Sequence, residues 1–116
     1  MDNMIGTQEI QNLEKIVQAG RTFGNKVFID GQAFFLGTAD LKRALPNIFT
    51  GVEKEARGKA RPATALYYLT EIDKLEAIVW QSPFRPFGLF LVNKQACLQQ
   101  IEVVSGSLER IQTEIS

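Results

Sequence analysis

The C-terminal end of the chain carries an aliphatic stripe that predicts a long amphipathic helix. Its members recur every three or four residues: Leu98, Ile101, Val104, Leu108, Ile111 and Ile115. This spacing places the six side chains on one face of a helix, close to the seam of a coiled coil. That face must be buried, either on the protein's own sheet or against a partner. The second alternative makes Leu108, Ile111 and Ile115 a dimer contact.

Length and composition predict one globular domain. The chain has 116 residues, of which 45 % are hydrophobic and 22 % are charged, so we expect a single domain over 1–116 with a loose N-terminus at 1–6. Thirteen basic residues balance thirteen acidic ones. A neutral chain lacks the positive surface that general nucleic-acid binding requires, and it self-associates more easily than a highly charged one.

The shortage of histidine and cysteine excludes several chemistries. The sequence has no histidine and one cysteine, Cys97, so a Ser-His-Asp triad, a Cys-His pair and an ordinary zinc site are impossible. We therefore predict no metal, no cofactor and no enzymatic activity. Neither a signal peptide nor an apolar run of membrane-spanning length is evident. With its single cysteine, the chain is expected to be cytoplasmic and not to bind membranes.

Residue patterns predict two helices and a hairpin in the first half. Apolar spacing indicates a helix over 8–19, and Gly24-Asn25 indicates a turn. Asp30-Gly31 separates two β-rich runs, 26–29 and 32–36, which is typical of a two-residue type I′ hairpin. A second helix is expected from Thr38, with a kink or break at Pro46.

The segment 62–81 is ambiguous. As a helix it begins with Pro62 and carries an apolar stripe; as strands, 64–71 and 75–81 flank a turn at 72–74. We prefer two strands, because an isolated hairpin needs further strands for stability. A loop over 82–86, a strand over 87–92 and a helix to about residue 115, weakened at 105–107, complete the chain. We detect no internal repeat.

The predicted fold class is α+β, with an antiparallel sheet of about five strands covered by helices in the order α-ββ-α-βββ-α. This order resembles the roadblock (dynein-light-chain-like) family and, more loosely, the profilin-like and longin folds. The residues that carry the resemblance are the hairpin 27–36, the meander 64–92 and the helix from Lys94. The resemblance implies a homodimer joined edge to edge that serves small GTPases or trafficking complexes. It assigns no functional residue.

Two surface segments are candidate binding sites. The loop containing Trp80, Phe84, Arg85 and Phe87 is stiffened by two prolines and has the residue types that dominate protein interfaces. Its alternative role is to cover the core. Three cations on a glycine-containing loop, Arg57, Lys59 and Arg61, suit a phosphate or an acidic partner. The alternative for this loop is a solvated segment balanced by neighbouring glutamates.

Two further groups have more ordinary interpretations. Cys97 lies in the first turn of the last helix, where the helix dipole favours a thiolate, but a buried, inert thiol is preferred. Tyr67 and Tyr68 are expected to divide between core and surface. The sequence therefore predicts a non-enzymatic, self-associating adaptor or regulatory protein that binds another protein through apolar surface. The alternative is a small-ligand or phosphate-binding module that uses the basic loop.

Overall fold

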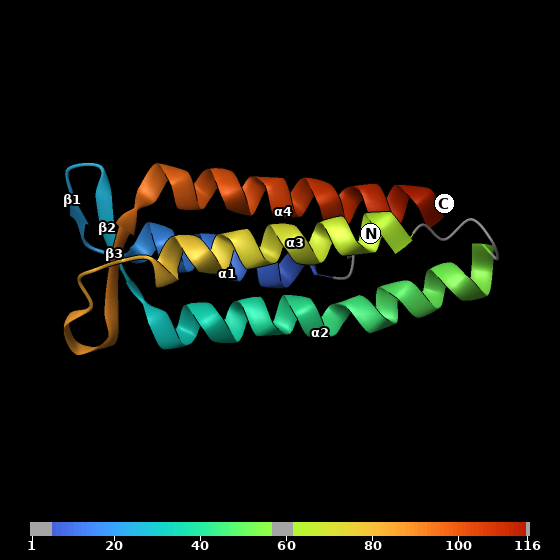
Figure 1. Cartoon of the computed structure of the whole chain (residues 1–116), viewed down its shortest axis with the longest axis horizontal. Coiled ribbons are helices and arrows are strands. Elements are labelled where there is room, and N and C mark those ends of the chain that lie inside the picture. Colours follow the sequence, from blue (N-terminus) through green and yellow to red (C-terminus); the bar gives the residue numbers. More distant parts are fainter. Residues whose placement is uncertain (1–5, 57–61, 116) are drawn as a thin grey trace.

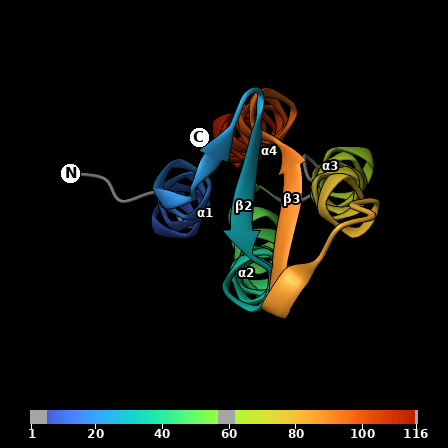
Figure 2. The ribbon, with the colours of Figure 1, turned by 90° about the vertical axis from the view of Figure 1, so that its left-hand side faces the viewer.

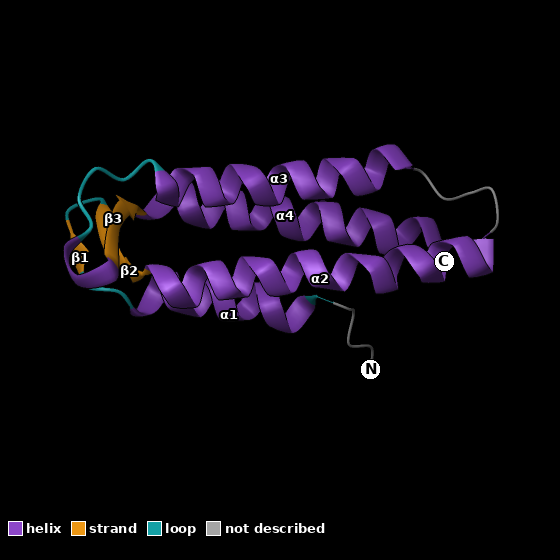
Figure 3. Ribbon diagram, turned by 60° about the horizontal axis from the view of Figure 1, so that its bottom comes forward, coloured by secondary structure: helices purple, strands orange, loops and turns teal. Residues whose placement is uncertain are grey.

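The computed structural model describes residues 6–56 and 62–115, with side chains described except at 44–56, 62–65, 112, 114 and 115. Within these ranges, four helices lie along the long axis and a small antiparallel sheet covers one end of the bundle (Figures 1 and 3). The molecule is elongated, with extents of 48 × 28 × 20 Å. The fold is α+β, as predicted, although the sheet caps the bundle instead of lying beneath its helices.

The elements follow the order α1 (Thr7–Ala19), β1 (Thr22–Phe23), β2 (Lys26–Asp30), α2 (Gly31–Ala56), α3 (Pro62–Trp80), the 3-10 turn η1 (Pro86–Gly88), β3 (Leu89–Asn93) and α4 (Lys94–Ile115). The three strands form one sheet in the order β1-β2-β3, with both pairs antiparallel. A two-residue turn at Gly24-Asn25 joins β1 to β2, and Gly24 supplies the positive φ that such a turn requires. This turn and the helix predicted over 8–19 are confirmed.

The sheet has one face toward the helices and one face away from them (Figure 2). Side chains alternate along a strand, so Val27 and Ile29 of β2 and Phe90 and Val92 of β3 are buried against the bundle. Phe28, at the centre of β2, lies opposite Leu91 of β3 on the outer face. The outer face therefore carries large apolar side chains where an end sheet would ordinarily be polar.

The core runs along the bundle axis between the four helices. It takes one stripe from each: Ile10, Leu13 and Val17 from α1, Phe34 and Leu41 from α2, Tyr68, Ile72, Leu75 and Val79 from α3, and Cys97, Ile101, Val104, Leu108 and Ile111 from α4. The described members of the C-terminal stripe, Leu98 to Ile111, thus pack against the core of their own chain, Leu98 being only partly buried. The helix that carries it continues through 105–107, where the Ser107 hydroxyl donates to the Val104 carbonyl at 2.8 Å.

The segment 62–81 is a helix, so the preferred prediction of two strands and of a five-stranded sheet is wrong. Pro62 occupies the first position of α3, where its missing N–H costs nothing. Tyr68, Ile72, Leu75 and Val79 follow at helical spacing and are all buried. The β-favouring residues of this segment are outweighed by that burial, because tertiary packing overrides weak propensity.

The Asp30-Gly31 hairpin is also wrong, because this pair joins β2 to α2. The Asp30 carboxylate accepts a hydrogen bond from the Ala33 N–H at 3.2 Å, which caps the helix. A side chain at Gly31 would meet the Phe90 ring at 2.2 Å. Asp30 and Gly31 therefore have the composition of a hairpin turn, but Asp30 caps a helix and Gly31 lets the backbone lie close to the Phe90 ring. The expected strand 32–36 is the first part of α2, and that helix bends in its second half, beyond the teal part in Figure 1, as expected near Pro46.

The chain contains an internal repeat, contrary to the expectation from the sequence. The segment EIQNLEKIV of α1 (9–17) matches EIDKLEAIV of α3 (71–79) at six of nine positions. The segment FIDGQA (28–33) likewise corresponds to LVNKQA (91–96). The first pair lies in the opening helix, and the second pair spans the strand-to-helix junction, of the same succession of helix, strand and helix. The units α1-β2-α2 and α3-β3-α4 therefore form two similar halves.

Equivalent hydrogen bonds support this correspondence. The Phe28 N–H donates to the Arg21 carbonyl at 2.9 Å, and the Leu91 N–H donates to the Phe84 carbonyl at 3.2 Å. Asn93 accepts from the Ala96 N–H at 2.9 Å, as Asp30 does from that of Ala33. Since Phe28 and Leu91 also face each other in the sheet, an approximate two-fold axis passes between them.

Candidate functional site

An apolar groove of about 750 Å³ lies at the sheet end of the molecule. It is lined from both halves of the chain, by Ile16, Ala19, Gly20, Arg21, Phe23, Phe28, Asp30, Ala33, Phe84, Pro86, Phe87 and Leu89. We call this the sheet-end groove. Its size is within the range of ligand and peptide pockets, and its walls are mostly aromatic and aliphatic.

Three aromatic rings in contact form one wall of the sheet-end groove. The centroids of Phe23 and Phe28 lie 5.5 Å apart with the rings perpendicular, and those of Phe28 and Phe84 lie 6.0 Å apart. Both geometries are favourable for aromatic pairs. Phe23 and Phe84 are nevertheless 57 % and 52 % exposed. The rings are therefore positioned by one another while much of their surface remains in water.

The loop 82–88 positions Phe84 and Phe87 at the groove. The Ser82 hydroxyl lies 2.7 Å from the Leu91 carbonyl and 3.0 Å from that of Phe84. Together with the bond from the Leu91 N–H to Phe84, these contacts cover the outer edge of β3 and hold the loop on the sheet. Phe84 is thereby fixed beside the sheet-end groove.

In the isolated chain, Phe87 has two energetically unfavourable features, a strained backbone and an exposed ring. Its backbone has a φ of 54°, in the left-handed region that bulky residues rarely adopt. Its ring is fully exposed. Such backbone strain costs about 1–3 kcal/mol and is concentrated at functional sites. Phe87 therefore combines strain with an unburied ring at the edge of the groove.

Two residues of opposite charge lie within this apolar lining. Arg21 and Asp30 are both exposed and both line the groove. The Asp30 carboxylate uses one oxygen for the cap on α2 and is fixed by that bond. A charge of each sign on one apolar surface gives an occupant two fixed points for electrostatic recognition.

The four residues of the predicted aromatic loop are divided between two places. Phe84 and Phe87 line the sheet-end groove, but Trp80 and Arg85 do not and belong to a second aromatic cluster with Phe35 and Phe90. Trp80 stacks on Phe35 at 4.6 Å, and the Arg85 guanidinium lies 5.3 Å from the Trp80 centroid. Arg85 also donates to the carbonyls of Trp80 and Ser82. The Arg85 guanidinium packs on the Trp80 and Phe90 rings of its own chain, although both Arg85 and Trp80 remain exposed.

Two residues of the C-terminal stripe that were predicted to contact a partner, Leu108 and Ile111, are buried. Leu108 and Ile111 are only 1 % and 5 % exposed within the single chain. Their assignment as partner-binding residues is therefore corrected to the core, which was the other interpretation of the stripe. The Ile115 side chain lies outside the described residues. Arg57, Lys59 and Arg61 also lie outside them, so the phosphate-binding alternative stays a prediction.

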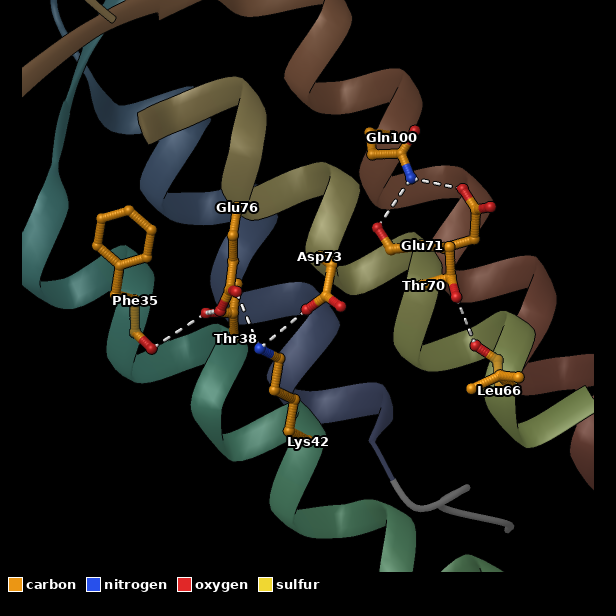
Figure 4. Close-up of polar contacts among 9 residues, drawn as sticks. All are labelled: Phe35, Thr38, Lys42, Leu66, Thr70, Glu71, Asp73, Glu76 and Gln100. Carbon is orange, nitrogen blue, oxygen red and sulfur yellow. Dashed lines mark hydrogen bonds and ion pairs between the residues drawn. The ribbon is translucent and has the colours of Figure 1, made fainter. Parts of the chain in front are cut away.

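Polar clusters between the helices hold the bundle together (Figure 4). Lys42 of α2 lies 2.9 Å from Glu76 and 3.1 Å from Asp73 of α3, and the hydrogen bond that Lys42 donates to Glu76 raises the pKa of Lys42. The Thr38 hydroxyl donates to the Glu76 carboxylate as well. A lysine whose pKa is raised remains a cation and is a poor general base. This cluster therefore clamps α2 to α3.

A second cluster joins α3 to α4. Glu71 is 4 % exposed, and its carboxylate accepts from the Gln100 amide at 2.7 Å and from Lys74 at 3.1 Å. The hydrogen bond from Gln100, followed by that from Lys74, lowers the pKa of Glu71. A buried charge is tolerated when its oxygens are hydrogen-bonded in this way. The role of Glu71 is thus structural.

Several residues of the sheet-end groove were not predicted as site residues. Phe28 was predicted only as part of a strand, and Phe23, Arg21 and Asp30 were given no binding role. A usable signal existed in Lys26-Val27-Phe28-Ile29-Asp30, where strand alternation places Phe28 on the face opposite Val27 and Ile29. An aromatic residue on the solvent face of a short strand indicates a binding surface.

No protein-family model, curated protein sequence or solved structure matches the chain. The resemblance to the roadblock family stays a prediction, and the element order from which it was inferred differs from the observed one at 62–81. In the described part of the chain, no group of three His, Cys, Asp or Glu residues is arranged to hold a metal ion, and no helix is long and apolar enough to cross a membrane.

Proposed function

We propose that this chain is a non-enzymatic adaptor or regulatory protein that binds an apolar protein segment in the sheet-end groove and also self-associates. The observation that carries the proposal is Phe87, which is strained and fully exposed beside three further aromatic rings. Burying one such ring contributes about 1.5–3 kcal/mol, comparable with the cost of its backbone conformation. Burying the Phe87 ring in a complex would therefore offset the free-energy cost of its backbone conformation.

The chemistry of the groove specifies the ligand class. Its walls offer aromatic and aliphatic contacts, and among the residues that the structure describes, its charged lining residues are Arg21 and Asp30. A segment with two or more aromatic or aliphatic side chains and a nearby charge meets these features. The absence of histidine from the sequence and the structural roles of the buried carboxylates support binding without catalysis.

Selection from a displayed library of random peptides on the immobilised protein tests this function. We expect enrichment of peptides with spaced aromatic or aliphatic residues. Fluorescence anisotropy of a labelled, enriched peptide should show binding about tenfold or more weaker to Phe84→Ser and Phe87→Ser variants. Leu66→Ser is the control, because Leu66 is also a large exposed apolar residue but lies on α3 outside the groove. Failure to enrich any peptide, or equal binding by all variants, would contradict the proposal.

A further inference from the structure

The sheet-end groove presents a protruding ring and a hollow on the same surface. Phe87 is fully exposed at the edge, whereas Phe23, Phe28 and Phe84 line the neighbouring space. A surface with both features fits a copy of itself. In a two-fold symmetric contact, the Phe87 ring of each copy enters the groove of the other copy, so the same contact forms twice.

The two charged residues of the groove can also pair with the same two residues of a second copy. Arg21 and Asp30 are an opposite pair on one surface. Across a two-fold axis, Arg21 of one copy can face the partner's Asp30, and the reverse contact follows by symmetry. The formal net charge of the chain is zero, so no long-range repulsion opposes the encounter.

We propose that a second copy of this chain occupies the sheet-end groove, with the two sheet ends facing each other. The proposal rests on the proposed function and names the partner for that site. It moves the self-association contact away from the C-terminal helix, whose Leu108 and Ile111 are buried. The aromatic groove and its two charges, contributed by both halves of the chain, form the contact.

This arrangement dictates the shape of the dimer. The helices run away from the sheet end (Figure 1), so the two bundles point in opposite directions. The particle should have a longest dimension close to twice the 48 Å of one chain. A dimer joined along the helices would instead keep nearly the length of one chain and become thicker. Small-angle X-ray scattering distinguishes the two shapes directly.

The test combines light scattering after size-exclusion chromatography with small-angle X-ray scattering, from micromolar to millimolar protein. We expect a concentration-dependent dimer with the elongated shape. The Phe87→Ser variant should weaken dimerisation at least about tenfold and remain folded by circular dichroism, because the ring lies outside the core. Leu66→Ser is the control and should dimerise like the unchanged chain.

A charge series tests the docking geometry. Arg21→Glu should weaken the dimer by setting like charges against each other, and adding Asp30→Asn should restore part of the loss by removing the repulsion. Asparagine keeps the helix cap, so α2 is preserved in the double variant. If adding Asp30→Asn does not restore dimerisation, Arg21 does not face the partner's Asp30 and the proposal is wrong.

Other outcomes overturn the proposal as clearly. A monomer at millimolar concentration, a compact side-by-side dimer, or a dimer unaffected by Phe87→Ser would each do so. If peptides bind the groove of a monomeric protein, the proposed function stands and the second copy is excluded. If the elongated dimer forms but no peptide competes with it, the second copy stands and binding of another protein at this site fails.

Discussion

At the scale of single residues, burial explains why the Cys97 thiol is expected to be unreactive. Cys97 is fully buried, and burial raises the pKa of its thiol to about 11. The helix dipole at the start of α4 favours a lower thiol pKa, but the effect of burial is larger. The preferred interpretation from the sequence, a buried and inert cysteine, agrees with this burial.

The Cys97 thiol should therefore resist alkylation in the folded protein. At about pH 8 only about one thiol in a thousand is ionised at that pKa, and its sulfur is shielded from reagent. We expect iodoacetamide labelling, followed by mass spectrometry, to proceed at the rate of unfolding and to become fast in denaturant. Rapid labelling under native conditions would show that the start of α4 opens readily.

Glu71 provides a pH-dependent contribution to stability. Its pKa is lowered in the folded state by the bond from Gln100, so the folded protein favours the ionised carboxylate. This contribution is present above the ordinary pKa of a glutamate and is lost as the pH falls through the lowered value.

The Glu71→Gln variant should be less stable than the unchanged chain by about 1 kcal/mol at neutral pH, because it exchanges charge-assisted hydrogen bonds for neutral ones. The difference should shrink at acidic pH, as the pH falls through the lowered pKa of Glu71 and the carboxylate itself becomes protonated. Urea unfolding at both pH values measures it. Glu102→Gln is the control, since Glu102 is exposed on α4. A constant difference at both pH values would assign the loss to packing.

At the scale of elements, each strand of the central pair leads directly into a helix through the same cap. Asp30 and Asn93 accept from the N–H three residues onward, at the starts of α2 and α4. These bonds satisfy N–H groups that a helix start otherwise leaves without partners. The junctions fix the angle between the sheet and the bundle, and hence the position of the sheet-end groove.

Asp30→Ala and Asn93→Ala should each lower the free energy of unfolding by about 1 kcal/mol. Asp30→Asn should retain most of the stability, because asparagine is an equally good cap. Urea unfolding monitored by circular dichroism measures all three. An equal loss for Asp30→Asn and Asp30→Ala would assign the effect to the charge and not to the cap.

The sequence predicted the elements whose signals were local and unambiguous. The helix at 8–19, the turn at Gly24-Asn25, the strand before Asn93 and the final helix are all observed. It misassigned 62–81 and Asp30-Gly31, where one pattern fits two structures. Tyr68 and Thr70 favour strands, and only the burial of Tyr68, Ile72, Leu75 and Val79 in the core decides that the segment is a helix.

At the scale of the whole molecule, two similar halves form one core. Leu13 and Leu75 occupy equivalent positions in the repeat, and both are fully buried. The halves meet along the bundle and in the sheet, where β2 pairs with β3. Neither half encloses its own apolar stripe, so we expect the two to fold as a single cooperative unit.

Leu13→Ala and Leu75→Ala should therefore cost similar amounts, each about 2–5 kcal/mol, with one unfolding transition and an unchanged denaturant dependence. Leu36→Ala is the control, because Leu36 is largely exposed and its loss should cost little. Urea unfolding followed by both fluorescence and circular dichroism checks the prediction. Two separate transitions would show that the halves unfold independently.

The sequence by itself determined what depends on neighbours along the chain: the amphipathic helices, the absence of histidine chemistry and the neutral charge. Tertiary structure decided the rest. It buried Leu108 and Ile111, turned Arg85 back onto Trp80, and gathered Phe23, Phe28, Phe84 and Phe87 around one groove. Periodicity shows which side chains share a face, but which faces are covered depends on contacts between residues distant in sequence. Those contacts are set by packing the two halves together, and no local pattern records them.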